Sequence, residues 1–576
     1  MDRRARTLAW LAATLAVAAA ALFACASAGA ATKEIRFTTS DGVELQTTLY
    51  GDPEQARPTI VEFSPYGNDS GSVAVGPEFN FLLVQIRGTG DSDGSFDALG
   101  PRTQKDVQEV LGWACDQPWS NGTLGLNGFS ASAITIYNSL HLKLPCVKAA
   151  VLRSGTFELY RDLLWPGGIS NLVPGAGVLG LIGGPALLQG IDRLLRNPQS
   201  SADVLDGLLG AGFDGFLHST QDAWWRQRGF RGDANHLPIL MIDGFFDVES
   251  RGAFQAFQHF RKDGAQLLVT GAHDGAPAGT NGGVRATGRW FDHFLRGVHN
   301  GAQKGKTVRL LLSSGDREDY LGGDFIRRGG ADWPLPGTHW QQLFLNPAKS
   351  GSADSLNDGS LTLKPATQAV RQSYPAVPTL PTNSDPPNTA IIGAAGVNQL
   401  SGAFPLLTED TLTEPIGLSY ATAPLQENAI AAGPATLDLH LSSTAAETGI
   451  WAILSDVSPD GTAHPLIAGR LSSAYPRVNR KRSLIDPKSG AIVQPYNSFS
   501  RKQPAAPGSE RRYQVEFWPI GNRFQAGHRI RLDIVGASAA SLPSQPGTNS
   551  VLAGGPDGAS LQLPLLRGSD LKTALP

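Results

Sequence analysis

Three residues of this chain, Ser130, Asp247 and His273, have the types and the order that nucleophilic catalysis requires. A serine hydroxyl is a weak nucleophile at neutral pH, so it needs a neighbouring base, such as a histidine, to take its proton. A carboxylate that holds the imidazole in the right tautomer completes the arrangement. Ser, Asp, His is also the chain order in which α/β-hydrolases carry these residues. Together the three residues predict a catalytic triad.

Each of the three residues follows a short run that predicts a buried strand. These runs cover residues 123–127, 237–242 and 266–269. The carboxyl ends of such strands form the edge at which open α/β sheets bind ligands. A serine at a sharp turn from strand to helix, here in Gly128-Phe129-Ser130, has its hydroxyl lifted clear of the sheet. The sequence therefore predicts an α/β-hydrolase fold with the triad at this edge.

Each residue also has a structural alternative. A Gly-x-Ser tripeptide can be a surface turn, and Ser132 stands where the strict Gly-x-Ser-x-Gly pattern has its second glycine. Asp247 could cap a helix over residues 249–262, and His273 could be an ordinary loop histidine. Asp243, on the same segment as Asp247, is the alternative acid. The chain order and the shared position at strand ends favour the triad Ser130, Asp247 and His273.

The rest of the N-terminal half alternates between strand and helix signals. Strands are expected at residues 34–37, 43–49, 59–63, 81–86 and 147–151, with a helix at 131–140 and another at 103–115 that has Thr103 as its N-cap. The turn at 39–42 predicts a hairpin between the first two strands. This alternation predicts a mainly parallel sheet with helices on both faces.

The pattern of secondary-structure signals changes at two further points along the chain. Between 155 and 236 the alternation stops, and the Gly-, Leu- and Trp-rich sequence predicts a helical cap with helices at 187–195 and 203–209. From 339 onward, short β-rich runs separated by Pro and Gly predict a β-sandwich. The expected division is a signal peptide at 1–30, a catalytic domain at 31–154 and 237–338, a cap at 155–236 and the sandwich at 339–576.

Seven further stretches carry motifs. They are residues 64–67 (SPYG), 84–94 (VQIRGTGDSDG), 106–113 (DVQEVLGW), 117–122 (QPWSNG), 222–226 (DAWWR), 290–301 (WFDHFLRGVHNG) and 526–532 (AGHRIRL). With the triad, they resemble the cocaine-esterase and X-Pro dipeptidyl-peptidase family of serine hydrolases, which includes α-amino-acid ester hydrolases and glutaryl acylases. The resemblance covers nearly all of the chain after the N-terminal segment. Ala131 and Ala133 depart from it, because many relatives have Tyr and Gly there.

The resemblance implies a fold and a mechanism. It implies that the C-terminal sandwich is a jelly roll beside the active site, and that Tyr66 and the N–H of Ala131 form the oxyanion hole. Since Ala131 contributes a backbone N–H, the loss of a large side chain there affects the acyl pocket rather than the chemistry. The implied reaction cleaves an ester or amide through an acyl-enzyme intermediate, with no metal ion or organic cofactor.

Two other functions stay open. Chain length and motif match favour an esterase or acylase, but an X-Pro dipeptidyl-peptidase, which needs carboxylates to hold a free α-amine, is the alternative within the family. A surface- or carbohydrate-binding protein with an inactive hydrolase domain is the alternative of another class. The intact set Ser130, Asp247, His273 and Tyr66 favours an enzyme.

The N-terminal segment predicts export to the periplasm or the medium. A basic stretch at residues 3–6 precedes an apolar run at 8–23 and small residues at 26–30, as in a cleaved signal peptide. Lipid attachment at Cys25 and an uncleaved membrane anchor are the alternatives. No second long apolar run follows, so no stable membrane span is expected in the mature form.

Charge and cysteine content limit the partners. The net charge is −3 without a basic stripe, which argues against nucleic acid as a partner. A small ester or amide, or a short peptide, is the expected substrate, and the oligomeric state stays open. Cys115 and Cys146 could form a disulfide in an oxidising compartment or remain as buried thiols.

Overall fold

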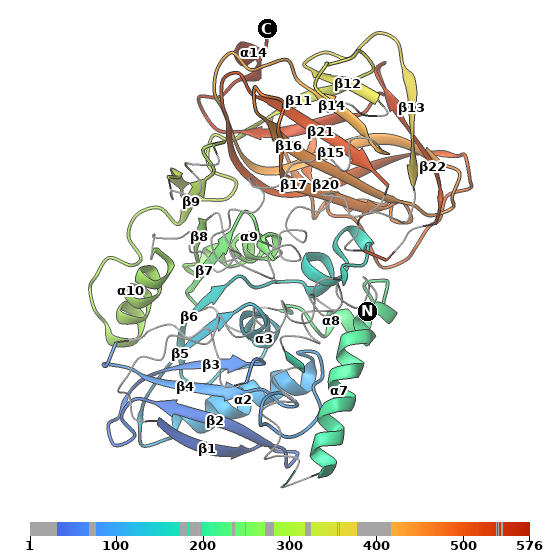
Figure 1. The fold of residues 1–576 in the computed structure, drawn as a ribbon. Helices are drawn as coiled ribbons and strands as arrows, with labels where there is room; N and C mark the ends of the chain where they lie inside the picture. The colour runs from blue at the N-terminus through green and yellow to red at the C-terminus, as the bar shows by residue number, and fades with distance from the viewer. Residues whose placement is uncertain are drawn as a thin grey trace, which may run out of the picture.

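The computed structural model describes residues 32–67, 76–172, 182–183, 195, 198–232, 237–247, 249–270, 282–316, 319, 324–353, 355, 357–376, 416–536, 538, 541–542 and 545–576. Figure 1 shows two bodies stacked along the long axis of the molecule. The body formed by the earlier part of the chain mixes helices and strands, and the body formed by the later part is rich in strands. This is the predicted combination of an α/β domain and a C-terminal β domain.

The first body is built on a sheet of ten strands, counted over the described residues, in the order β1-β2-β4-β3-β5-β6-β7-β8-β9-β10. The strands are β1 (Thr32–Thr38), β2 (Glu44–Tyr50), β3 (Arg57–Ser64), β4 (Asn80–Gln85), β5 (Ser120–Phe129), β6 (Val147–Arg153), β7 (Ile239–Gly244), β8 (Gln266–Thr270), β9 (Val308–Leu312) and β10 (Ile326–Gly330). Pairing is parallel from β4 through β3 and β5 to β9, and antiparallel at both ends of the sheet. The prediction of a mainly parallel sheet with an N-terminal hairpin is confirmed.

Both faces of this sheet are covered by helices. The helices are α2 (Pro101–Cys115), α3 (Ala131–Ser139), α9 (Ser250–Phe260) and α10 (Gly282–Arg296). Side chains alternate between the faces of a strand, so Val61 of β3 joins the apolar cluster that contains α2, α3 and α9. Its neighbour Ile60 joins a second cluster with Trp290 of α10 on the other face. Burial on both faces explains why the central strands read as continuous apolar runs.

Helix α2 begins two residues earlier than predicted. Pro101 is its first residue, and Gly100 occupies the N-cap position without a side-chain bond. The carboxylate of Asp97 accepts the N–H groups of Gly100 at 3.1 Å, Arg102 at 2.9 Å and Thr103 at 3.3 Å. The prediction of Thr103 as the N-cap was wrong because Asp97, upstream of the helix, takes the free N–H groups of the first turn.

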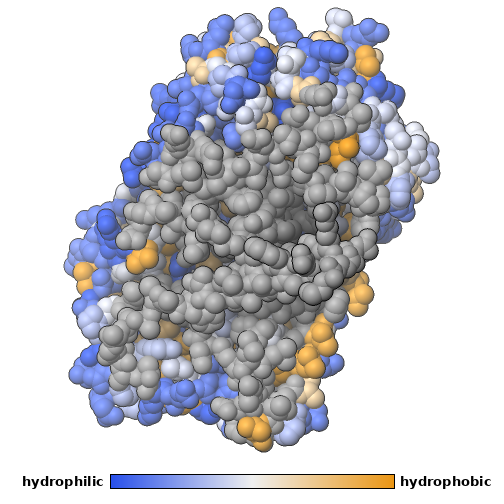
Figure 2. Space-filling view, in the orientation of Figure 1, coloured by the Kyte–Doolittle hydropathy of each residue, from blue (hydrophilic) through white to orange (hydrophobic). Residues whose placement is uncertain are grey.

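The described part of the segment between β6 and β7 contains helices joined by loops. Its elements are η1 (Tyr160–Leu164), η2 (Pro166–Gly168), α7 (Pro198–Leu217) and α8 (Ala223–Arg226). The predicted helix at 203–209 lies inside α7, whereas most of 187–195 lies outside the described residues. Figure 2 shows apolar side chains along the edge that α7 forms, where Leu205, Leu209 and Leu217 are exposed. In the described part of the chain, no helix is both long and apolar enough to cross a membrane.

The second body is a β-sandwich whose strand order returns on itself. Its main strands are β11 (His339–Asn346), β12 (Asn357–Thr362), β13 (Val370–Ala376), β14 (Leu418–Ala421), β15 (Ala429–Ser443), β16 (Gly449–Val457), β17 (Ala463–Ser472), β20 (Glu510–Phe524), β21 (Arg529–Val535), β22 (Gly547–Ala553) and β23 (Ser560–Leu565). A two-stranded ribbon, β18 (Leu484–Ile485) with β19 (Ile492–Gln494), and helix α14 (Leu571–Ala574) complete it. Strand β23 pairs with both β11 and β15, which closes the sheet into a ring.

Cys115 and Cys146 are joined by a disulfide. The bond links the end of α2 to the residue before β6, so it spans the segment that contains β5 and α3. Of the two states that the sequence left open, the structure has the disulfide rather than the free thiols.

Candidate active site

Ser130 lies at a strained turn between β5 and α3. Its φ of 50° and ψ of −121° are unusual for a residue with a side chain, and it occupies the N-cap position of α3. The backbone N–H of Ser130 donates to the carbonyl of Arg153 at 2.9 Å, which holds the turn against β6. A Cβ at Gly128 would lie 2.7 Å from the backbone of Ala133, so the close return of the helix requires glycine there. This is the local geometry predicted for an exposed nucleophile.

Two hydrogen-bond donors meet beside this serine. The N–H of Ala131 points at the hydroxyl of Tyr66, with 3.1 Å between the nitrogen and the oxygen. The same hydroxyl is also hydrogen-bonded to Ser130. Burial raises the pKa of Tyr66 to about 12, so the phenol keeps its proton throughout the neutral range. An oxygen placed between Ser130, Ala131 and Tyr66 would therefore find two donors, which is the requirement for an oxyanion hole.

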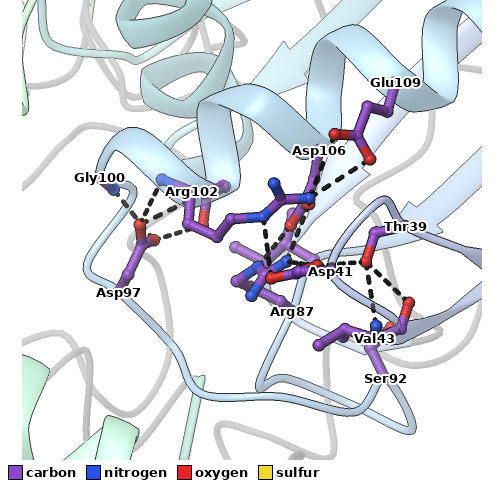
Figure 3. A network of polar contacts seen from close by, with 12 residues as sticks. Thr39, Asp41, Val43, Arg87, Ser92, Asp97, Gly100, Arg102, Asp106 and Glu109 are labelled. Carbon is purple, nitrogen blue, oxygen red and sulfur yellow. Dashed lines mark hydrogen bonds and ion pairs between the residues drawn. The ribbon is translucent and has the colours of Figure 1, made fainter.

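The loop that carries Tyr66 is braced from behind by the segment after β4. Gly90 packs so closely on the Tyr66 loop that a Cβ there would lie 2.9 Å from the Cα of Gly67. This segment is held in turn by Arg87, whose guanidinium is buried against Asp106 of α2. Figure 3 shows how Arg87 and Arg102 join Asp41, Asp106 and Glu109 in one network.

The acid segment follows β7. Asp247 is buried, and its Oδ1 accepts the backbone N–H of Glu249 at 2.9 Å. Helix α9 begins at Ser250 with Glu249, not Asp247, at its N-cap position. Asp247 thus forms a turn just ahead of the helix. It does not occupy the N-cap position that the alternative interpretation gave it.

Residues 271–281, and with them His273, lie outside the described residues. Strand β8 ends at Thr270, whose carbonyl accepts the N–H of Phe245 at 2.7 Å. Thr270, the last described residue before this gap, therefore lies beside the acid segment, three positions before His273 in the sequence. The structure brings together Ser130, Ala131 and Tyr66, and it places Asp247 at the end of β7; it does not describe where His273 lies.

Asp243 interacts with Asp247. It is fully buried at the end of β7, and its Oδ1 accepts the N–H of Gly244 at 2.7 Å. Burial raises the pKa of Asp243 well above its ordinary value, and the negative charge of Asp247 raises it further. Burial thus disfavours the charged form of Asp243, whereas a triad acid must be ionised to stabilise an imidazolium. This contrast favours Asp247 over Asp243 as the acid.

Sequence reasoning missed Glu249. The hydroxyl of Ser130 donates to Oε1 of Glu249 at 3.4 Å, and Glu249 is buried. Its carboxylate also raises the pKa of Tyr66, after the larger effect of burial. The available signal was an acidic residue two positions after Asp247, in a segment expected at the ligand-binding edge. The local pattern indicates only that a helix begins at this position, and Glu249 is the N-cap residue of α9.

The described residues contain no group of three or more His, Cys, Asp or Glu side chains that could hold a metal ion. The candidate site is thus a serine at a sharp turn, two convergent hydrogen-bond donors and buried carboxylates, at the carboxyl edge of a mainly parallel sheet. Fold and site together define the class: an α/β-hydrolase with a helical insertion and a C-terminal β-sandwich.

Comparison with known proteins gives the family. Residues 41–275 match the model of the X-Pro dipeptidyl-peptidase (S15 family), and residues 300–554 match that of the X-Pro dipeptidyl-peptidase C-terminal non-catalytic domain. A cocaine esterase of Rhodococcus sp. (strain MB1 Bresler) is 23% identical, over 89% of this chain and 92% of the relative. The chain belongs to the cocaine-esterase and X-Pro dipeptidyl-peptidase family of serine hydrolases.

Solved structures share the fold over nearly the whole chain. A CocE/NonD family hydrolase from Staphylococcus aureus superposes with a TM-score of 0.72 at 16% identity, covering 93% of this chain and 94% of that one. An α-amino-acid ester hydrolase superposes with a TM-score of 0.67 at 17% identity, covering 94% and 98%. The predicted family, fold class and enzyme class are confirmed, and the choice between esterase and peptidase is not made by these similarities.

Proposed function

We propose that this protein is an exported serine hydrolase that cleaves ester or amide bonds, with Ser130 as nucleophile, His273 as general base and Asp247 as the acid that orients it. The observation that carries the proposal is the convergence of the Tyr66 hydroxyl and the Ala131 N–H beside Ser130. A strained serine with two donors at its side suits the attack on a carbonyl carbon and little else.

The proposed reaction runs in two halves. His273 takes the proton of Ser130 as its oxygen attacks the carbonyl, and the charge that develops on the carbonyl oxygen is held by Tyr66 and Ala131. His273 then protonates the leaving group, which departs and leaves an acyl-serine. In the second half His273 activates a water that attacks the acyl group, and the serine regains its proton. Asp247 stabilises the imidazolium in both halves.

A substrate with an ammonium group near the scissile carbonyl is the second candidate, and Glu249 is the observation that favours it. Its carboxylate lies 3.4 Å from the nucleophile oxygen in a buried setting, where attraction to a cation is stronger than in water. Such a group occurs in α-amino-acid esters and at the free N-terminus of a peptide. The first would make the protein an ester hydrolase, and the second a dipeptidyl-peptidase.

One substrate panel tests both. It compares p-nitrophenyl propionate and the p-nitrophenyl ester of alanine with the anilides of Gly-Pro and Ala-Pro. We expect turnover of at least one ester, with alanine ester preferred over propionate if Glu249 holds an ammonium group. Labelling by a fluorophosphonate that disappears in Ser130→Ala identifies the nucleophile. A protein that neither turns over the panel nor takes the label would instead be a binding protein with an inactive hydrolase domain.

Export is proposed from two observations. The basic and apolar N-terminal segment has the composition of a signal peptide. The bond between Cys115 and Cys146 suits an oxidising compartment such as the periplasm or the medium. Lipid attachment at Cys25 would keep the protein at a membrane surface. Mass spectrometry of the mature N-terminus tests export and separates cleavage near residue 30 from processing at Cys25.

A further inference from the structure

Strand β20 of the C-terminal domain touches the acid segment. A Cβ at Gly521 would lie within 2.6 Å of three ring atoms of Phe245, so the aromatic ring lies directly on the backbone of β20. Phe245 is buried and stands two residues before Asp247. The next residue of the strand, Asn522, bridges to Ser313 beyond β9, so the same stretch of β20 is fixed to the catalytic domain.

A second contact lies on the other side of Asp247. Arg251, in the first turn of α9, is buried, and its Nε donates to Oε1 of Glu516 on β20 at 3.0 Å. Another nitrogen of the same guanidinium donates to Asp162 of η1, which is itself fully buried. One arginine therefore joins the catalytic domain, the inserted helical segment and the sandwich.

The two contacts flank Asp247 and Glu249. Phe245 precedes them and Arg251 follows them, and both are held by residues of one strand, Glu516 and Gly521. Figure 1 shows α9 at the boundary between the two bodies, on the side of the first body that faces the sandwich. Strand β20 is a single element over Glu510–Phe524, with a shift of register against β15 between Phe517 and Ile520, so both ends of the acid segment rest on the same strand.

We propose that β20 positions the acid segment, with Glu516 and Gly521 as positioning residues that act through Arg251 and Phe245. The inference rests on the proposed role of Asp247. The C-terminal domain, whose family model is described as non-catalytic, would then help to set the geometry of the active site as well as pack against the catalytic domain. A displacement of about 1 Å in a catalytic group can cost on the order of 10²-fold in rate, so small shifts of this segment are expected to show in kcat.

The first experiment compares Glu516→Ala with Glu516→Gln in the full chain. Glutamine still offers an oxygen to Arg251, so Glu516→Gln should keep most of its activity. Glu516→Ala should lose between about 10-fold and 100-fold in kcat with little change in KM. Both are measured on soluble, folded protein well below its Tm. Asp438→Asn is the matched control, because it breaks an ion pair that β20 makes through Arg512 away from the acid segment, and its kcat should stay at the wild-type value.

The second experiment does not depend on removing a buried charge. Gly521→Ala should displace Phe245, and with it the acid segment, and lower kcat, and the double variant Gly521→Ala with Phe245→Leu should recover a large part of the loss. If these contacts serve only to pack the two domains together, Glu516→Ala and Gly521→Ala should lower Tm and leave kcat of the folded protein unchanged. That result would overturn the proposed positioning role.

The variant Asp247→Asn separates an error in the proposed triad from an error in the proposed role of β20. If Asp247→Asn retains full activity in an otherwise unchanged chain, the assignment of the acid is wrong and the inference falls with it. If Asp247→Asn is inactive while Glu516→Ala and Gly521→Ala both keep wild-type kcat, the assignment stands and the positioning role of β20 is rejected.

Discussion

Tyr66 contributes a single hydroxyl to the proposed oxyanion hole, and this makes it a clean test at the scale of one residue. Tyr66→Phe keeps the ring and removes only the hydroxyl that faces Ala131 and Ser130. We expect kcat to fall by about 10²-fold to 10³-fold with little change in KM, because the lost bond strengthens only as the oxyanion forms. A rise in KM at unchanged kcat would make Tyr66 a wall of the pocket instead.

The triad makes a second prediction at this scale. Ser130→Ala, Asp247→Asn and His273→Ala should each lower kcat by at least ~10³-fold in a folded protein, and their effects should not add because the three act as one unit. Asp243→Asn is the control. Burial raises the pKa of Asp243, and an amide has nearly the shape of the protonated carboxyl that burial favours, so this variant should stay active. An inactive Asp243→Asn with an active Asp247→Asn would reverse the assignment.

The third prediction at the residue scale concerns the charge of Glu249. Glu249→Gln removes the negative charge and keeps the size of the side chain beside Ser130. If this charge holds an ammonium group, the variant should lose kcat/KM for the p-nitrophenyl ester of alanine, by about 10-fold or more for a charge-assisted bond. The propionate ester, which lacks only the amine, should react at nearly the same rate in both proteins. An equal loss on both esters would mean that Glu249 supports the nucleophile rather than the substrate.

Some of these site residues could be predicted from the sequence and others could not. Ser130, Asp247 and Tyr66 could be proposed because each sits in a local pattern, at a strand end or in a motif. Glu249 could not, because its approach to Ser130 joins residues more than a hundred positions apart through the fold of the sheet. The raised pKa of Asp243 was equally out of reach, since it depends on burial and on the charge of Asp247.

At the scale of elements, the central strands were predictable and their ends were less so. The apolar runs at 59–63, 147–151 and 237–242 became β3, β6 and β7 because burial on both faces leaves few polar positions. The predicted start of α2 was wrong because the N–H groups of its first turn donate to the carboxylate of Asp97, upstream of the helix. The local pattern around Thr103 does not reveal this contact. Contacts such as Gly521 on Phe245 have no signal in a single sequence.

The disulfide gives a prediction at this scale, because it closes the segment that carries β5, Ser130 and α3. Replacing both Cys115 and Cys146 by alanine should lower the free energy of unfolding by roughly 2 to 4 kcal/mol, since the unfolded chain gains freedom. Thermal unfolding with and without a reductant measures this. The wild type should lose stability on reduction, whereas the double alanine variant should not respond. Two freely titrating thiols in the folded wild type would contradict the bond.

At the scale of the whole molecule, the two bodies should not fold apart. Residues 31–340 expressed alone would expose the surface that β20 covers, including Phe245 and the guanidinium of Arg251, which would lose its partner Glu516. We expect insoluble or inactive protein, because a large uncovered apolar face promotes association. Residues 341–576 are the complementary fragment. Two soluble halves, with full esterase activity in the first, would contradict the integrated architecture.

The ring formed by the sandwich strands has a consequence for the order in which the molecule becomes native. β23 pairs with β11, which begins the domain, and with β15, so closure joins segments from opposite ends of the domain sequence. Contacts between such distant segments cost loop entropy before they contribute, which makes folding slow. We therefore expect activity to return late during refolding, after most helical signal has recovered, because β20 supports the acid segment only once its own domain has closed. Catalytic competence in this protein would then be a property acquired in the last folding step, governed by a strand that lies far from the reacting serine along the chain.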